Sequence, residues 1–301
     1  MKKIFRGLRS KKKKKTTKRA NAPTVPLSDA QVWDTLPESG RAAKFTHLIS
    51  GSALHPGQRR ENNEDAVLCL NAAVGSGVES PAFGIYVIAD GMGGHRNGEV
   101  ASETAVRALG SYLIGKLYKP LFGPDPQPTQ ESLQEIMEAA VQEAHRAVKK
   151  EAPGGGCTLT AALVLGNQMV IAHLGDSRAY AIYRDGRMEA LTTDHSLVKR
   201  LQEMGQLTEE EAAIHPQKSV LYRALGQGEK APADIFTGSL PNPGFLLICS
   251  DGLWGVVAED DIQRIVSSTA SPFLACQHLV EAANAAGGPD NISVVLVRAV
   301  S

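Results

Sequence analysis

Five times along this chain, an acidic residue beside glycine or asparagine stands at one end of a short apolar run. The clearest case is FGIYVIADGMGG, in which a run that predicts a buried strand ends on Asp90. A carboxylate there is costly to desolvate unless a positive group meets it, and the glycines let an ion or a phosphate approach the backbone. The stretch therefore indicates either such a binding site or a tight Asp-Gly turn.

The same pattern recurs at four other places. They are FLLICSDGLWG with Asp251, VIAHLGDSRAYAIY with Asp176, GGPDNISVVLV with Asp290, and RRENNEDAVLCL with Glu64 and Asp65. Taken singly, each acid is equally compatible with a solvent-exposed turn. Gathered on one edge of a core, the acids would repel one another and take up protons unless cations neutralised them. Oxygen ligands without His or Cys favour hard ions such as Mg²⁺ or Mn²⁺.

The rest of the pattern predicts an α+β domain. Apolar and alternating runs predict strands at 45–52, 64–70, 83–90, 157–165, 168–174, 178–184, 234–240, 245–250 and 291–298. Helical periodicity predicts long helices at 97–117 and 130–151, and shorter ones at 195–204, 208–213, 259–267 and 272–286. Strands in runs, with helices grouped between them, favour mostly antiparallel sheets. The segment 194–233 interrupts the strands and predicts a mobile flap; it contains Asp194, His195 and Arg223, which the sequence leaves unassigned.

The zero net charge of the chain hides a strong asymmetry. Residues 1–20 hold 11 of the 32 Lys and Arg residues and no acid, which leaves 21 basic against 32 acidic residues in the remainder. An acidic body suits cations better than nucleic acid, so no specific nucleic-acid readout is expected. We expect residues 1–42 to be a basic, disordered arm and linker, and residues 43–301 to be the folded domain.

The basic arm has two interpretations. It is either a solvated tail or a tether to an acidic partner, to nucleic acid or to an anionic membrane surface. Ile4, Phe5 and Leu8 beside the lysines favour the membrane. No apolar run approaches the length of a membrane span, and four scattered cysteines without a CxxC pair indicate a reducing compartment. The expected location is therefore cytoplasmic, with the inner face of the membrane as the possible point of attachment.

Several motifs occur together in a fixed order. They are RxxNED at Arg60–Asp65, DGMGGHxxGE at Asp90–Glu99, GCTLTAAL from Gly156, GDSRAY at Gly175–Tyr180, SDGLW at Ser250–Trp254 and DNIS at Asp290–Ser293. Over about residues 45–300, the chain thereby closely resembles the metal-dependent serine/threonine protein phosphatases, the PPM or type 2C family, in their bacterial form. The resemblance implies a sandwich of two antiparallel β-sheets flanked by α-helices on both outer faces, with the active site at one end.

The resemblance also assigns roles to individual residues. It implies that two divalent ions, Mn²⁺ or Mg²⁺, and a third, weaker ion are held by Asp90, Gly91, Asp251, Asp290, Glu64, Asp65 and Asp176, with Glu64 and Asp65 either binding directly or holding metal-bound water. Asp90 would bridge the two ions, Gly91 would bind through its carbonyl, and Asp176 would share the weaker ion with Asp251. Arg60 would hold the phosphate. Asn291 would support the ligands without binding metal.

One position departs from the family pattern. Many eukaryotic members have a histidine two residues after the bridging aspartate, proposed as the general acid, and this chain has Met92 there. His95 lies three residues further on and is not expected to inherit that role. We expect His95 to orient the loop behind the metal ligands instead.

The implied activity is hydrolysis of phosphoserine and phosphothreonine in proteins by a water or hydroxide bridging two metal ions, opposing a bacterial Ser/Thr kinase. Two alternatives stay open at this point. The first is a catalytically silent regulatory module of the same fold, although every expected ligand position carries an acid. The second is a hydrolase of small phosphoesters, against which the sequence says little.

Overall fold

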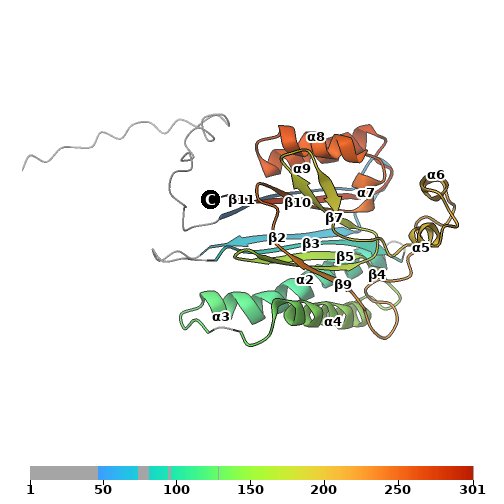
Figure 1. The fold of residues 1–301 in the computed structure, drawn as a ribbon. Helices are drawn as coiled ribbons and strands as arrows, with labels where there is room; N and C mark the ends of the chain where they lie inside the picture. Colours follow the sequence, from blue (N-terminus) through green and yellow to red (C-terminus); the bar gives the residue numbers. More distant parts are fainter. Residues whose placement is uncertain (1–46, 74–80, 94–95, 128, 301) are drawn as a thin grey trace, which may run out of the picture. The chain divides into compact units, whose positions relative to one another are not determined.

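The structure is a computed structural model that describes residues 47–73, 81–93, 96–127 and 129–300 (Figure 1). The predicted arm at 1–42 and His95 lie outside the described residues. Among the described helices, none is both long and apolar enough to cross a membrane. All four cysteines are free thiols, as their scattered positions predict.

Within the described residues, the strands form two antiparallel sheets. The first sheet has the order β1-β11-β10-β7-β8, with bounds β1 (His47–His55), β11 (Ile292–Val300), β10 (Gly244–Cys249), β7 (Arg178–Tyr183) and β8 (Met188–Ala190). The second has the order β2-β3-β5-β6-β9, with bounds β2 (Asp65–Ala72), β3 (Phe83–Met92), β5 (Leu159–Leu165), β6 (Gln168–Leu174) and β9 (Asp234–Gly238). The short β4 (Gly156–Cys157) pairs with the end of β3.

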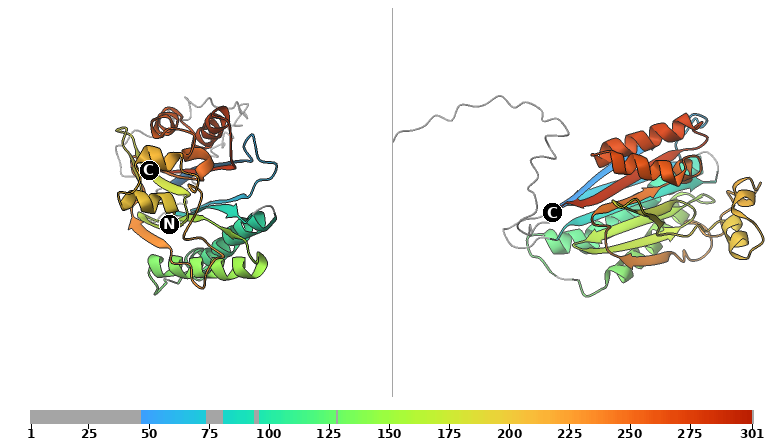
Figure 2. Two further views of the ribbon diagram at one scale, coloured as in Figure 1. Left: turned by 90° about the vertical axis from the view of Figure 1, so that its right-hand side faces the viewer. Right: turned by 45° about the horizontal axis from the view of Figure 1, so that its top comes forward.

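Helices cover the outer face of each sheet (Figure 1). The second sheet is covered by α2 (Arg96–Leu113) and α4 (Leu133–Glu151), joined through a π-helical turn η1 (Ile114–Tyr118) and α3 (Lys119–Phe122). The first sheet is covered by α8 (Glu259–Ser268) and α9 (Pro272–Ala285), which follow the single turn α7 (Asp251–Trp254). Figure 2 shows α5 (Leu197–Glu203) and α6 (Glu209–Ala213), which belong to the predicted flap, beyond one end of the sheets.

Three apolar layers explain why the central strands are apolar throughout. In β3, Phe83 and Ile85 face the helices α2 and α4, whereas Tyr86 and Ile88 face the other sheet. In β10 and β11, residues alternately face the other sheet and the helices α8 and α9. A strand buried on both faces reads as a continuous apolar run. The core is therefore a sandwich with one layer between the sheets and one under each helical layer.

The predicted α+β class and the sandwich of antiparallel sheets are confirmed, and the differences lie at element ends and in the shortest elements. The helix predicted at 97–117 is α-helical only to Leu113 and then widens into η1. The helix predicted from 130 begins at 133, because Ser132 and Glu135 form a capping box there. The short elements β8 and α7 were not predicted, since three or four residues carry too little periodicity to identify them.

Candidate metal-binding active site

The predicted acids meet where the layer between the two sheets turns polar. Asp65 and Asp90 are directly opposite each other in the β2–β3 register. Side chains alternate along a strand, so Asp90 lies on the same face as Tyr86 and Ile88, which pack between the sheets. The carboxylates therefore replace the next pair of core side chains at this end of the sandwich.

Asp90 is held inside the strand rather than at its exit. The strand β3 runs on to Met92 because β4 pairs with it beyond Asp90. The Asp90 N–H donates to Thr158 Oγ1 at 2.9 Å, and the Thr158 N–H donates to the Asp90 carbonyl at 2.8 Å. Thr158 Oγ1 also lies 2.8 Å from Ser177 Oγ, next to Asp176. Thr158 thereby connects two of the acid-bearing segments.

Ser250, which follows strand β10 of the opposite sheet, anchors Asp65 and is itself held by Ser293 of β11. Ser250 Oγ donates to Asp65 Oδ2 at 2.9 Å and accepts the Ser293 N–H at 2.9 Å. The next residue, Asp251, begins α7. The strand β10 ends at Cys249, so Asp251 reaches the site from a helical turn and not from the strand itself.

Asn291 organises the loop that carries Arg60 and Glu64. Its Oδ1 accepts the Glu64 N–H at 2.8 Å, and its Nδ2 donates to the carbonyls of Pro56 and Asn62 at 3.0 and 2.9 Å. One amide side chain thus fixes three backbone groups of residues 56–64. That Asn291 supports metal ligands without binding metal itself stays a prediction.

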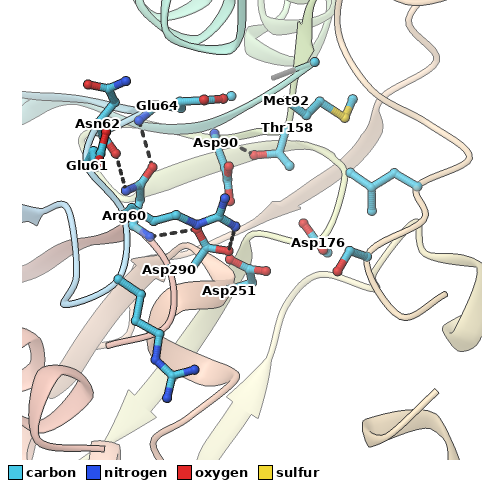
Figure 3. Close-up of a pocket in the computed structure, with 16 residues that line it drawn as sticks. Arg60, Glu61, Asn62, Glu64, Asp90, Met92, Thr158, Asp176, Asp251 and Asp290 are labelled. Carbon is cyan, nitrogen blue, oxygen red and sulfur yellow. Dashed lines mark hydrogen bonds and ion pairs between the residues drawn. The ribbon is translucent and has the colours of Figure 1, made fainter. Parts of the chain in front are cut away.

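A pocket of about 480 Å³ opens over these groups (Figure 3). The predicted site residues that line it are Arg60, Glu64, Asp90, Gly91, Asp176, Asp251, Asp290 and Asn291. Asp65 is not in the lining and lies buried behind it, with 6% of its surface exposed. His95 lies outside the described residues.

Sequence reasoning gave no site role to several residues of the pocket wall. They are Arg59, Glu61, Asn62, Gly93, Thr158, Ser219 and Leu221. Thr158 lies within the GCTLTAAL motif, which was a usable signal. Ser219 and Leu221 come from the segment 194–233, and nothing in their local sequence indicates that the chain folds back onto the pocket.

Burial and mutual repulsion disfavour charge on the acids of the site. Burial raises the pKa of Asp65 to about 7, that of Asp176 to about 8 and that of Asp251 to about 6. Burial also raises the pKa of Asp90 well above its ordinary value, and the charges of Asp65 and Asp251 add to this effect. Without a cation, the site therefore holds protons near neutral pH.

The donor set fits a hard divalent cation. Asp65 Oδ1 and Asp251 Oδ1 are buried and have no hydrogen-bond partner among the described residues. The backbone also approaches closely at Gly91, where a Cβ atom would lie 2.3 Å from the Gly98 carbonyl oxygen. In the part of the chain that the structure describes, no three Asp, Glu, His or Cys side chains already surround one point as metal ligands. The oxygens thus line one pocket without forming a closed cage.

Arg60 lies at the edge of the pocket. Its Nη2 is 2.8 Å from Asp290 Oδ2, and 57% of its side chain is exposed. The hydrogen bond to Asp290 is the main cause that raises the pKa of Arg60. Figure 3 shows the guanidinium beside the cluster of acids, where it offers planar donors to an anion that enters from solvent.

A family profile matches most of this chain. The profile of the protein phosphatase 2C family matches residues 58–284. A serine/threonine phosphatase stp of Listeria innocua is 38% identical over 220 residues, which are 71% of this chain and 84% of that protein.

Solved structures of bacterial phosphatases share the fold. The serine/threonine phosphatase of S. agalactiae has a TM-score of 0.71 and 33% identity, covering 83% of this chain and 99% of that one. The catalytic domain of the serine/threonine protein phosphatase PstP, in complex with two manganese ions, has a TM-score of 0.69 and 31% identity, covering 85% of this chain and 100% of that one.

Proposed function

The chain belongs to the protein phosphatase 2C family and is a serine/threonine protein phosphatase, and we propose that its acidic pocket binds the divalent metal ions on which this hydrolysis depends. The observation that carries the proposal is the set of buried carboxylates around one pocket, two of which have an oxygen without a partner among the described residues. Such oxygens are stabilised by a bound cation.

The proposed ligands are the acids predicted from the sequence. Two ions, Mn²⁺ or Mg²⁺, would be held by Asp90, the Gly91 carbonyl, Asp251 and Asp290, with Glu64 and Asp65 as further ligands or holding water, and Asp176 and Asp251 would take a third, weaker ion. Divalent ions at this site would lower the pKa of water and so supply a nucleophile near neutral pH. The two manganese ions in the PstP structure support the choice of metal.

The chain's own residues orient the phosphoester. The Arg60 guanidinium would hold phosphate oxygens through two parallel hydrogen bonds. Its pairing with Asp290 keeps it pointed along the pocket wall. Met92 and Leu221 line the same pocket and give it an apolar side, where the substrate backbone can lie away from the carboxylates.

Phosphate release from a phosphothreonine peptide by the purified protein tests the proposal. We expect turnover with Mn²⁺ or Mg²⁺, none with excess EDTA, and none from the Asp90→Asn variant with metal. Turnover that survives EDTA would exclude the metal mechanism. No turnover by the folded wild type with either metal would favour the regulatory module. A preference for a small phosphoester over the peptide would favour the second alternative, a hydrolase of small phosphoesters.

Two further parts of the proposal rest on the sequence. Residues 43–301 would be the catalytic domain, and residues 1–42 a basic arm that attaches this cytoplasmic protein to the anionic inner face of the membrane or to an acidic partner. The proposed functional counterpart is a Ser/Thr protein kinase that phosphorylates the same substrates.

Co-sedimentation of the full chain with phosphatidylserine vesicles tests whether the basic arm binds an anionic membrane. Substitution of Lys11–Lys15 by glutamine should abolish it, and equal sedimentation of both proteins would exclude the membrane.

A further inference from the structure

The flap segment 194–233 begins with Asp194 and His195, which the reaction described above does not use. Both side chains are buried, with 6% and 2% of their surface exposed. We propose that Asp194 and His195, together with Arg178, are positioning residues that fix the turn carrying Asp176 and couple it to the flap. The inference rests on the proposed function of Asp176 as a ligand of the weaker metal ion.

His195 forms two hydrogen bonds with Gly175, the residue before Asp176. Its N–H donates to the Gly175 carbonyl at 2.7 Å, and its Nδ1 accepts the Gly175 N–H at 3.1 Å. Because Nδ1 is an acceptor, the ring proton lies on Nε2, which is 3.1 Å from Asp234 Oδ2. Gly175 has a φ of 105°, so its conformation is one that only glycine adopts easily. The imidazole thus fixes a turn that has little intrinsic stiffness.

Asp194 binds Arg178, which lies on the other side of the turn. Its carboxylate accepts two hydrogen bonds from Arg178, one from Nε at 2.9 Å and one from Nη2 at 2.8 Å. The exposed fractions of the two side chains are 8% and 24%, so this bidentate pair is largely shielded from water. Asp176 therefore lies between Gly175, which His195 holds, and Arg178, which Asp194 holds.

Arg178 also reaches the helical turn that begins at Asp251. Its guanidinium carbon lies 3.5 Å from the centroid of the Trp254 ring, which is a cation–π contact. Trp254 Nε1 in turn donates to the Asp176 carbonyl at 3.0 Å. The two acids proposed to share the weaker ion are therefore connected through one arginine and one tryptophan.

The returning strand of the flap extends this connection into the pocket. The Tyr222 N–H donates to the His195 carbonyl at 3.0 Å, and Ser196 forms an isolated β-bridge with Leu221. Leu221 lines the pocket. His195 therefore takes part both in the hydrogen bond that orders the flap and in those that order the Asp176 turn. By linkage, an ion bound at Asp176 should stabilise the flap, and an ordered flap should raise the affinity of the site for the ion.

The test measures Mn²⁺ binding by calorimetry and amide hydrogen exchange of residues 194–233, so that neither readout depends on turnover. The variants are Asp194→Asn, Arg178→Lys, His195→Asn and His195→Gln. Asparagine can place an oxygen near the position of Nδ1 and keep the bond from Gly175, whereas glutamine can place its amide nitrogen only near the position of Nε2. The control is Arg187→Lys, which alters an exposed pair with Asp185 on the adjacent hairpin.

In the wild type, we expect Mn²⁺ to slow exchange in the flap. Arg178→Lys, Asp194→Asn and His195→Gln should weaken the lowest-affinity Mn²⁺ site at least about tenfold and remove this protection, because each removes at least one of these hydrogen bonds. His195→Asn and the control should retain both. Tight Mn²⁺ binding should be unchanged throughout.

The outcomes separate this inference from the proposed function. A wild type that binds no Mn²⁺ and has no activity contradicts the proposed function. A wild type that binds Mn²⁺, alongside folded variants with unchanged weak-site affinity and flap exchange, overturns the positioning role. Equal behaviour of His195→Asn and His195→Gln overturns the assignment of Nδ1. If Arg178→Lys does not fold, as judged by circular dichroism, the two histidine variants decide the question.

Discussion

Asp251 exemplifies the conflict between stability and function at the scale of a single residue. Burial raises its pKa to about 6, and Asp290 adds repulsion. Its Oδ1 is buried and has no hydrogen-bond partner in the described part of the chain. A carboxylate in this environment destabilises the metal-free fold above its pKa, and a bound cation reverses that effect. The residue is therefore unfavourable for folding alone and suited to metal binding.

Replacing this carboxylate should separate stability from activity. We expect Asp251→Asn to raise the free energy of unfolding of the metal-free protein at pH 8 by on the order of 2 kcal/mol, because a buried charge is removed. Phosphate release should fall at least about a hundredfold. Thermal unfolding in EDTA and the peptide assay check the two effects. Equal destabilisation with and without metal would contradict this account, and the exposed Asp260→Asn serves as the control.

Arg60 should act on the phosphate and not on the fold. Its side chain is exposed and pairs only at the pocket edge, so Arg60→Ala should leave thermal stability nearly unchanged. A lost bidentate contact to phosphate predicts a fall in kcat/KM of about 10- to 100-fold. The kcat/KM of Arg60→Lys should lie between those of Arg60→Ala and the wild type. The control Arg107→Ala, on the outer helix α2, should have the kcat/KM of the wild type. Steady-state kinetics on the phosphopeptide would contradict the role if Arg60→Ala matched the wild type.

At the scale of elements, the site depends on how closely α7 approaches the start of β11. A Cβ atom on Gly252 would lie 1.9 Å from the Asn291 carbonyl oxygen, a contact that backbone atoms cannot relieve without moving apart. This close approach brings Asp251 on α7 beside Asp290, which lies two residues before the start of β11 at Ile292. Glycine is required there for space and not for its backbone angles.

Gly252→Ala should therefore damage both the fold and the site. We expect a loss of about 1–3 kcal/mol in unfolding free energy from overpacking, with weaker Mn²⁺ binding as α7 moves away from β11. The matched control is Gly115→Ala in η1, where a Cβ atom would meet nothing within 4 Å. Chemical denaturation and calorimetry measure the two effects. Wild-type Mn²⁺ affinity in the Gly252 variant would contradict the argument.

Most strands and helices could be predicted because burial sets their residue pattern. Apolar runs such as 83–90 and 245–250 are buried on both faces, and Ser132 with Glu135 marks the true start of α4. The turn η1 could not be predicted, because its residues IGKLY continue the helical periodicity of α2. Local sequence does not distinguish a wider helical turn from a regular one.

The family motifs predicted more of the site than physical reasoning from the residues alone. The sequence placed each acid at the end of a predicted strand, yet only the register of the structure shows that Asp65 and Asp90 lie opposite each other. The role of Asp194 and His195 could not be predicted, because they contact the Gly175–Arg178 turn across about 20 residues of chain, through bonds that no local pattern encodes.

At the scale of the whole molecule, protons and metal ions compete for the same carboxylates. Asp65, Asp176 and Asp251 have folded pKa values of about 7, 8 and 6, whereas the ordinary value for Asp is 3.8. Between pH 4 and 8, the folded chain therefore holds protons that the unfolded chain has released. By linkage, the stability of the metal-free protein falls as pH rises through this range.

The pH dependence should differ with and without metal. In EDTA, we expect Tm to fall from pH 5.5 to pH 8, because the free energy of unfolding falls by up to about 1.4 kcal/mol per pH unit for each proton that the folded chain holds and the unfolded chain does not. The stabilisation by Mn²⁺ should grow over the same range, because the ion displaces those protons. Differential scanning calorimetry at several pH values checks both trends, and Asp251→Asn should flatten them. A Tm in EDTA that is constant or rises across this range would contradict the account.

Anomalous scattering from crystals grown with Mn²⁺ would show whether the carboxylates at the end of the sandwich hold divalent ions. Two strong peaks are predicted in the pocket, both within ligand distance of Asp90, with Asp251 and Asp290 as further ligands. A weaker third peak is expected between Asp176 and Asp251. An empty pocket, or Mn²⁺ bound by other residues while phosphate release continues, would contradict the account.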